Sequence, residues 1–331
     1  MIAVPANVRD VALRAGVSVG TVSNVLNRPD KVSPATIDRV QEAIDALGFI
    51  RNEAARQLRV GRSSSIGLVV LDVRNPFYTD LARGAEDAAG RSGLSVILGN
   101  SDDDPSREAA YLDLFEEQRV HGVLISPHGD IAPRLAALQQ RGIPSVVVDG
   151  RAEGFSSVAV DDVAGGRMAV EHLLQQGRRR IAFLGGPSGI RQVDERLAGA
   201  RAAAPDLEVL EAAALTVLEG RRIGRELAAR AERPDAVFAA NDLLAVGLLQ
   251  GLQVQGGVRV PDEIALIGYD DIDFATSTVV PLSSVRQPTT TLGERAVELL
   301  LEQASDTPAP TRSIVFTPEL VVRESTAAQR D

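Results

Sequence analysis

Two rhythms of hydrophobic and polar positions run along this chain of 331 residues. Within residues 1–50, apolar side chains recur at helical spacing in short segments. From Ile66 onward, short and nearly continuous apolar runs alternate with longer amphipathic stretches. The first rhythm predicts a small helical unit, and the second predicts parallel β-sheets with helices on both faces.

Three helices are predicted before residue 50, each preceded by a residue that can accept hydrogen bonds from the first helical amides. These N-cap residues are Asn7, Ser18 and Ser33, and Pro34 suits the first turn of the third helix. Gly16 can form the turn after the first helix, because glycine tolerates a positive φ. The predicted helices cover residues 8–15, 19–26 and 34–47.

The apolar runs after residue 65 predict buried strands, and helical stretches separate most of them. They are too numerous for one sheet, so we expect two Rossmann-like lobes. The C-terminal stretch SIVFTPELVVREST adds two extended runs around Pro318. The other predicted strands cover residues 66–71, 94–100, 121–127, 143–150, 179–186, 235–242 and 263–271.

Several of these runs lead into a polar residue. Because open parallel sheets bind ligands at the carboxyl ends of their strands, such residues are candidates for a site. They are Asn75, Ser126, Asp149, Asn241 and Asp270.

Composition narrows the function classes. The length favours two or three domains, and 44% hydrophobic residues suffice for sizeable cores although aromatic residues are only 3%. The absence of cysteine excludes disulfides, thiolate chemistry and cysteine-ligated metals, and no cofactor is expected. No apolar run approaches the ~18 residues of a membrane span, and no secretory signal is visible, so we expect a cytoplasmic protein without membrane contact.

Charge is distributed unevenly. The net charge of −10 argues against a chain that simply coats nucleic acid. Residues 1–62 carry nine basic and six acidic side chains, a net of +3, which leaves −13 for the rest. A basic head on an acidic body fits a DNA-binding module joined to something else, although so few charges can also arise by chance.

The stretches DVALRAGVS and TVSNVLN near the start resemble the helix-turn-helix of the lactose-repressor (LacI/GalR) family of bacterial transcription regulators. Further stretches are similar to that family in the same order, among them LGFIRNEAARQL, IGLVVLDVRNPFYTDLARGAEDAA, FAANDLLAVGLLQGL, VPDEIALIGYDDIDFA and PELVVREST. The resemblance covers essentially the whole chain. It implies an α/β protein with a small all-α helix-turn-helix head and two Rossmann-like lobes of the periplasmic-binding-protein type. The implied parts are a DNA-binding head over 1–50, a hinge helix and linker over 51–65, and a two-lobed effector-binding and dimerisation domain over 66–331.

The second helix of a helix-turn-helix enters the major groove with its N-terminal residues against the base edges. In the family, the positions of Val19, Gly20 and Asn24 read bases; here Val19 suits a thymine methyl and Asn24 suits an adenine edge. Gly20 has no side chain, so it either reads nothing or lets the backbone approach the DNA closely. Phosphate contacts, or simply helix capping and solvation, are expected from Ser18, Thr21 and Ser23.

The stretch NEAARQL matches the family's hinge helix. It is too short to be stable alone, and in the family it folds when two copies meet in the minor groove. Leu58 matches the wedge that enters the central base step and kinks the duplex, with ordinary packing against the core as the alternative. Arg56 is expected to strengthen binding to all DNA sequences alike.

The resemblance also implies a ligand cleft between two lobes. Arg196 matches the family arginine that holds ligand hydroxyls or carboxylates, and Asp270 in GYDD matches its acidic partner. We expect these two to hold the effector from opposite lobes; an interlobe salt bridge without ligand is the alternative. Guanidinium, carboxylate and aromatic groups together suit a polyhydroxylated, sugar-like molecule. The other candidates for the cleft wall are Phe77, Tyr78, Ser126, Asp161 and Asn241.

Three features depart from the family pattern. Leu215 stands where the family often has an aromatic residue, which puts sugar stacking from that side in doubt. Arg74 and Arg191 add positive charge near the expected cleft mouth, so an acidic or phosphorylated effector stays open. The heptad tail that builds tetramers is missing after Arg323, so a homodimer is expected.

Two rival classes have less support. For an enzyme, the three histidines lack metal-like spacing, and GGPSGIRQ lacks the lysine and hydroxyl residue of a phosphate-binding loop. A solute-binding protein shares the two lobes but has no use for a helix-turn-helix. We therefore expect a ligand-responsive repressor of carbohydrate genes that binds a palindromic operator as double-stranded DNA. The identity of the effector, and whether it releases or tightens DNA, stay open.

Overall fold

The computed structural model describes residues 6–49, 63–305 and 307–327, apart from the side chains of Asn27 and Gln255. The chain falls into two compact units, residues 1–61 and residues 62–331. The described part of the first unit, residues 6–49, is called the head, and the second unit is called the body.

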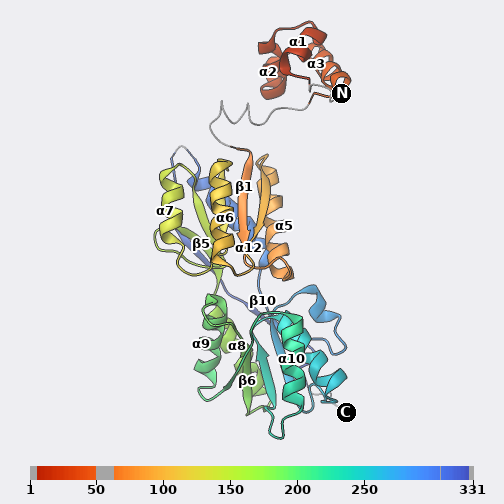
Figure 1. The fold of residues 1–331 in the computed structure, drawn as a ribbon, viewed down its shortest axis with the longest axis vertical. Helices are drawn as coiled ribbons and strands as arrows, with labels where there is room; N and C mark the ends of the chain where they lie inside the picture. Colours follow the sequence, from red (N-terminus) through yellow and green to blue (C-terminus); the bar gives the residue numbers. More distant parts are fainter. Residues whose placement is uncertain (1–5, 50–62, 306, 328–331) are drawn as a thin grey trace. The chain divides into compact units, whose positions relative to one another are not determined.

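The head has three α-helices among its described residues, packed around a small apolar core (Figure 1). The side chain of Asn7 accepts a hydrogen bond from an amide of the first helix at 2.8 Å, and that of Ser18 does the same for the second helix at 3.0 Å. Gly16 ends the first helix with a φ of 63°. The bounds are α1 Val8–Ala15, α2 Val19–Asn27, a 3-10 turn Pro29–Lys31 and α3 Pro34–Leu47. The predicted helices are confirmed, with α2 one residue longer than expected. The predicted cap of α3 was wrong, because the Ser33 hydroxyl bonds Thr36 Oγ1 rather than a helical amide.

Lobe 1 of the body is a parallel sheet with helices on both faces (Figure 1). Its elements are β1 (Ser65–Val70), α5 (Pro76–Arg91), β2 (Ser95–Asn100), α6 (Pro105–Glu117), β3 (Gly122–Ile125), α7 (Ala132–Gln140), β4 (Ser145–Val148), β5 (Ser156–Val160), α12 (Thr289–Gln303) and β11 (Ser313–Phe316). The strands lie in the order β11-β5-β4-β3-β1-β2, and every pair is parallel. Helices α5 and α12 cover one face, while α6 and α7 cover the other.

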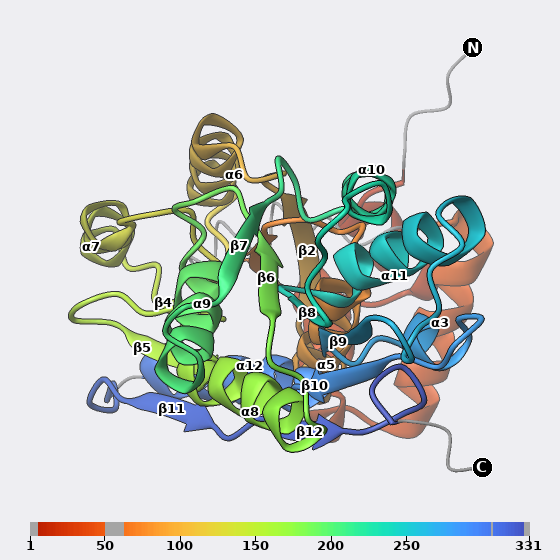
Figure 2. The same cartoon turned by 90° about the horizontal axis from the view of Figure 1, so that it is seen from below.

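Lobe 2 repeats this plan (Figure 2). Its elements are α8 (Asp162–Gln175), β6 (Ile181–Gly185), α9 (Arg191–Ala203), β7 (Glu208–Glu211), α10 (Val217–Ala228), β8 (Ala236–Ala239), α11 (Asp242–Gln250), the π-helical turn η2 (Gly251–Gln255), β9 (Ala265–Asp270), the 3-10 turn η3 (Asp273–Thr276), β10 (Ser283–Arg286) and β12 (Glu319–Val321). The strand order is β12-β10-β9-β8-β6-β7, and the pair of β12 with β10 is antiparallel. Helices α8 and α9 pack on one face, with α10 and α11 on the other.

The described chain crosses between the lobes three times: after β5, after β10, and between β11 and β12. The two extended runs around Pro318 are therefore strands of different lobes, with β11 beside β5 and β12 beside β10. The two predicted lobes are confirmed. Lobe 1 is completed by α12 and β11, which follow β10 of lobe 2, and lobe 2 is completed by β12, which follows β11 of lobe 1. Neither lobe is therefore one continuous segment.

Three strands were not predicted: β5, β7 and β10. Each has only four or five residues, and serine or glutamate interrupts its apolar pattern, so no run stands out in the sequence. Strand β2 was predicted, but it is the edge of its sheet rather than a strand buried on both faces. Ile97 and Leu98 on β2 are consequently exposed.

Candidate functional site

A cavity of about 60 Å³ lies between the two lobes, at the carboxyl ends of their strands. Lobe 1 contributes the connection from β1 to α5 and the residues that follow β2 and β4. Lobe 2 contributes the start of α9, the loop before α10 and the ends of β8 and β9. The polar and aromatic residues of the wall are Asp72, Arg74, Asn75, Phe77, Tyr78, Asp103, Asp149, Gln192, Arg196, Thr216, Asn241 and Asp270.

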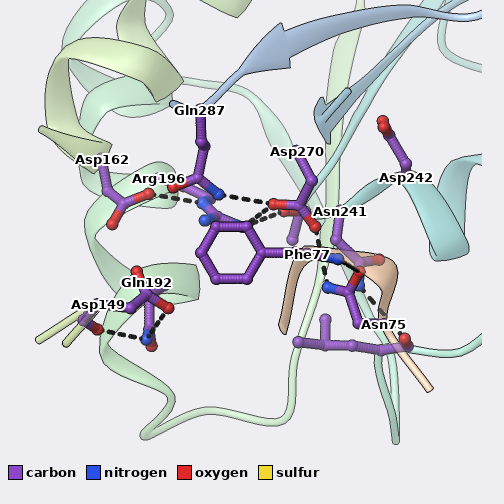
Figure 3. A network of polar contacts seen from close by, with 12 residues as sticks. Asn75, Phe77, Asp149, Asp162, Gln192, Arg196, Asn241, Asp242, Asp270 and Gln287 are labelled. Atoms are coloured by element: carbon purple, nitrogen blue, oxygen red, sulfur yellow. Dashed lines mark hydrogen bonds and ion pairs between the residues drawn. The ribbon is translucent and has the colours of Figure 1, made fainter. Parts of the chain in front are cut away.

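Arg196 is the buried cation of the cavity wall (Figure 3). Its Nε donates to Asp162 Oδ1 at 2.8 Å, and Nη1 donates to the carbonyl oxygen of Ala240 at 2.7 Å. Its guanidinium also lies over the ring of Tyr269, 3.7 Å from the centroid. Burial is the largest single influence and lowers the pKa of Arg196, but Asp162 and the other acidic groups around it together outweigh burial and raise this pKa above its ordinary value. The guanidinium group of Arg196 is thus charged and held in one position.

The backbone of α8 lies close to α9 and so supports this position of Arg196. A Cβ atom built on Gly166 would lie 2.1 Å from the carbonyl oxygen of Arg196, so no larger residue fits there. Asp162 is the first residue of α8, directly after the crossing from lobe 1. The contact between Asp162 and Arg196 therefore ties a crossing segment to the cavity.

Asp270 ends β9 and is held from two sides. Its Oδ2 accepts a hydrogen bond from Asn75 Nδ2 of lobe 1 at 2.9 Å, and Oδ1 accepts from Gln287 Nε2 at 2.8 Å (Figure 3). Arg196 Nη1 lies 3.8 Å from the same Oδ1. Burial raises the pKa of Asp270 even though Arg196 and these amides favour its ionised form. Gln287 lies in the second crossing segment, so this segment too reaches the cavity.

Asp149 forms the second contact across the cleft. Gln192 Nε2 of lobe 2 donates both to the carbonyl oxygen and to Oδ2 of Asp149, each at 2.7 Å, and Arg191 Nη2 donates to the same carbonyl oxygen at 3.0 Å. Tyr78 Oη lies 3.4 Å from Asp149 Oδ2. Burial, aided by Asp162, raises the pKa of Asp149 to about 7. The lobes are thus joined by hydrogen bonds at two points of the cleft.

The two arginines expected to make the cleft mouth positive are already paired. Arg74 Nε contacts Asp72 at 2.8 Å, and its Nη2 contacts Asp102 at 2.8 Å. Arg191 Nη1 contacts Glu195 at 2.6 Å while its Nη2 holds the backbone of Asp149. Both guanidinium groups thus already have carboxylate partners within the protein.

The aromatic part of the wall comes from lobe 1, whereas both lobes contribute aliphatic side chains. Phe77 and Tyr78 pack edge to face, with ring centroids 4.9 Å apart and planes at 80°. Leu215 lines the cavity from lobe 2. Ring stacking on a ligand is therefore available from lobe 1.

In the head, helix α2 presents a short exposed face. Val19, Gly20 and Asn24 are exposed, as expected for residues that read bases. Ser18 Oγ accepts from the Thr21 amide at 3.0 Å and also forms a hydrogen bond with Thr21 Oγ1 at 2.9 Å. The Ser18 hydroxyl therefore caps the helix, and the Thr21 hydroxyl is bonded to that cap.

Comparisons with known proteins find relatives of both the head and the body. Residues 7–52 match the sequence model of the lacI family of bacterial regulatory proteins, and residues 170–326 match that of a periplasmic binding protein-like domain. The ribose operon repressor of Bacillus subtilis is 34% identical over 97% of this chain and 98% of that protein. The HTH-type transcriptional repressor PurR of Photobacterium profundum is also 34% identical, over 97% of this chain and 98% of that repressor.

This chain belongs to the lacI family of bacterial regulatory proteins. A lac repressor dimer bound to operator and an anti-inducer aligns with a TM-score of 0.85 at 26% identity, over 98% of this chain and 100% of that one. A LacI family regulator of Enterococcus faecium with bound ribose aligns with a TM-score of 0.73 at 30% identity, over 80% of this chain and 100% of that chain. The chain is a DNA-binding transcription regulator with a ligand-binding body, in a family of regulators rather than enzymes.

The structure brings five of the seven expected effector residues of this LacI family member to the cavity. They are Phe77, Tyr78, Arg196, Asn241 and Asp270. Asp161 is exposed instead and caps α8 by accepting from the Ala164 amide at 2.9 Å. Ser126 is buried at the end of β3 and does not line the cavity.

One expectation about the cleft was wrong. Arg196 and Asp270 do not face each other from opposite lobes, because α9 and β9 both belong to lobe 2. The ion pair considered as an alternative is likewise within one lobe. The contacts that do cross the cleft among the described residues join Asn75 to Asp270, and Gln192 and Arg191 to Asp149.

Sequence reasoning did not assign six residues that line the cavity or contact its wall: Asp72, Asp103, Asp162, Gln192, Thr216 and Gln287. Asp162 was missed by a single position, because Asp161 and Asp162 are adjacent and burial alone separates their roles. The polar ends of the predicted strands did signal Asn75 and Asp149.

The hinge residues Arg56 and Leu58 lie outside the described residues. Among the described helices, none has both the length and the apolar character needed to cross a membrane.

Proposed function

We propose that this regulator is a cytoplasmic, homodimeric repressor of genes for carbohydrate uptake or catabolism. Its effector is a neutral, unphosphorylated, polyhydroxylated molecule of the ribose kind. The effector is bound in the cleft by Phe77, Tyr78, Arg196, Asn241 and Asp270. The relatives alone do not select this effector, since a ribose operon repressor and PurR are equally identical to the chain. The charge of the cavity carries the proposal.

The cavity wall is rich in hydrogen-bond acceptors. It contains the carboxyl groups of Asp72, Asp103, Asp149 and Asp270 against the guanidinium groups of Arg74 and Arg196. Oδ1 of Asp103 and Oδ1 of Asp149 are buried and have no hydrogen-bond partner among the described residues. Hydroxyl groups can donate to these oxygens, whereas a phosphate group would lie against several carboxylates.

Effector binding must open this arrangement. A volume of about 60 Å³ is far below the roughly 300–1,000 Å³ of typical ligand sites. The ligand therefore competes with the hydrogen bonds from Asn75 to Asp270 and from Gln192 to Asp149 that join the lobes. It binds two arrangements of the lobes with different affinity, which is the thermodynamic requirement for a switch.

The switch acts on DNA through the hinge over residues 51–65. This segment lies largely outside the described residues, and the proposal rests on its match to the family hinge. Two short hinge helices need each other and the DNA to fold, so a change in the separation of their attachment points favours or removes them. Leu58 enters the central base step, and Arg56 strengthens binding to every site. The sign of the response is to be measured.

Dimerisation is supported by exposed apolar side chains on both lobes. On lobe 1 they are Ile97 and Leu98 of the edge strand β2. On lobe 2 a groove of about 440 Å³ is lined mostly by apolar side chains. Its strongly exposed members are Val254, Phe274 and Val279. Clustered exposed apolar side chains, as in this groove, mark protein interfaces, and a two-fold dimer would present two equal heads to DNA.

Two measurements test the function. Selection from random DNA should return palindromic sites, and affinity for them should fall steeply with salt concentration as counterions are released. A thermal-shift titration should show that D-ribose raises the melting temperature, and that D-ribose 5-phosphate at equal concentration does not. Asymmetric sites, or a stronger shift with the phosphate ester, would contradict the repressor and the effector class respectively.

A further inference from the structure

A buried carboxyl group lies behind the cleft without lining it. Asp242 is the first residue of α11 and is fully buried (Figure 3). Its Oδ2 accepts a hydrogen bond from the Ile272 amide at 2.9 Å, and its Oδ1 accepts from Ser284 Oγ at 2.7 Å. Ser284 Oγ in turn accepts from the Asp271 amide at 3.0 Å. The two amides that follow Asp270 are thus both fastened to Asp242, one directly and one through Ser284.

The turn that these amides form needs external support. Asp270 has a φ of 104° and Asp271 a φ of 56°, left-handed conformations that side-chain-bearing residues rarely adopt. The carboxyl group of Asp271 contacts Arg286 and Arg323 at 2.7 and 2.6 Å. That of Asp270 instead reaches Asn75 across the cleft. The two adjacent carboxyl groups thus leave this turn toward different partners.

The fold reserves space for this arrangement. A Cβ atom built on Gly268 of β9 would lie 2.0 Å from Asp242 Oδ1, so the glycine is what admits the carboxyl group. Burial raises the pKa of Asp242 well above its ordinary range, and the nearby Asp270 adds to the rise. Burying an acid is unfavourable unless it is hydrogen-bonded, and both oxygens of Asp242 accept hydrogen bonds, those from Ile272 and Ser284.

We propose that Asp242 is a positioning residue of the ligand site. Together with Ser284 it holds the left-handed turn after β9, and this turn aims the carboxyl group of Asp270 at the ligand and at Asn75. The choice of sugar as probe rests on the proposed function. The role of Asp242 can also be measured without any ligand, by an NMR signal. This signal comes from the side-chain amide of Asn75, and its position reports the hydrogen bond that this amide donates to Asp270.

The test uses NMR of the full chain, with the Asn75 side-chain signal assigned by its loss in Asn75→Ala and its unbonded position taken from Asp270→Ala. Asp242→Ala removes both acceptors, and Ser284→Ala removes the bridge should the first variant fail to fold. Asp242→Asn is the conservative variant, because its oxygen can still accept from Ile272 and its amide can donate to Ser284. Asp235→Ala is the matched control, since Asp235 also holds backbone amides of lobe 2, those of Arg179 and Arg180.

We expect Asp242→Ala and Ser284→Ala to move the Asn75 signal toward its position in Asp270→Ala, and Asp242→Asn to restore it. D-ribose affinity should fall about tenfold in the same two variants, as for loss of one hydrogen bond to a charged group, and not fall further when Asp270→Ala is already present. An Asn75 signal that stays in place, or that moves equally in Asp235→Ala, overturns the proposal. Wild-type protein that does not bind D-ribose would contradict the proposed effector, while the NMR signal would still decide the role of Asp242.

Discussion

The exposed face of α2 and the cleft of the body hold their polar side chains in opposite ways. On α2 the partners are local: Ser18 bonds Thr21 three residues along the same helix, and Asn24 is exposed. In the cleft, Arg196 contacts Asp162 and the backbone of Ala240, which are 34 and 44 residues away in the chain. A substitution of the exposed Asn24 on α2 should therefore change recognition without changing stability, whereas one in the cleft should change both.

The largest effect is expected from Arg196→Ala. The substitution leaves Asp162 and Asp270 buried without their cation, and breaking a buried pair in this way costs about 3–5 kcal/mol. Denaturant unfolding of the body should show this loss, and the response to D-ribose should disappear. Arg74→Ala is the control, because Arg74 pairs with Asp72 and Asp102 while largely exposed and should cost at most about 1 kcal/mol. Equal losses of unfolding free energy in Arg196→Ala and Arg74→Ala would contradict the expectation that the buried ion pair matters more than the surface one.

The next effect is a pH dependence from Asp149, whose pKa is raised by burial to about 7. Between about pH 4 and pH 7, the folded protein therefore keeps Asp149 protonated. The unfolded chain, with an ordinary aspartate pKa near 4, has already released this proton. Relative to Asp149→Asn, the wild type should gain about 2–3 kcal/mol of stability between pH 8 and pH 5 and lose it again as pH rises through 7. Thermal unfolding across this range measures the difference.

The control for Asp149 is Asp104→Asn. Hydrogen bonds from Ser106 lower the pKa of Asp104, so its contribution should change in the opposite direction and be lost as pH falls. A wild-type curve parallel to that of Asp149→Asn over the whole range would show that the cleft does not retain this proton.

On α2, Asn24→Ala should relax discrimination at one base position per half-site by about 1–3 kcal/mol and leave the unfolding of the head unchanged. The exposed side chain of Asn24 is the physical reason for the unchanged stability. Binding measurements on a set of singly substituted operators give the effect at each position. Arg56→Ala is the comparison and should weaken all of these sites alike. An unaltered base preference in Asn24→Ala would mean that Asn24 does not read bases.

The smallest effect is expected from Gly20→Ala. A Cβ atom on Gly20 would meet only Ser18 Oγ, at an ordinary contact distance of 3.6 Å, so the head has room for it. Alanine should then stabilise the head by up to about 1 kcal/mol, while Ser18→Ala should cost about 1 kcal/mol through loss of the cap. If Gly20→Ala instead weakens DNA binding while stabilising the head, the backbone at Gly20 approaches the DNA closely. Destabilisation of the head by alanine would show that the glycine serves the fold.

Sequence reasoning succeeded where partners are near in the chain. The caps Asn7 and Ser18, and the buried and exposed sides of α2, follow from spacing over a few residues, because a helix places its own neighbours. The apolar runs also predicted two lobes, since each run is long enough to stand out. The strands β5, β7 and β10 were missed because their apolar runs are too short to stand out.

What the sequence by itself determined is the helical head, the two-lobed body, and the edge of the sheets at which Asn75, Asp149 and Asp270 lie. Only the tertiary structure decided which of these side chains meet. Arg196 and Asp270 proved to share a lobe, because the chain crosses between the lobes three times and separation along it does not indicate lobe membership. Asn75 meets Asp270 across 195 residues, and Asp162 rather than Asp161 meets Arg196. Such contacts depend on how helices and sheets pack, and packing is set by the whole body rather than by any local pattern.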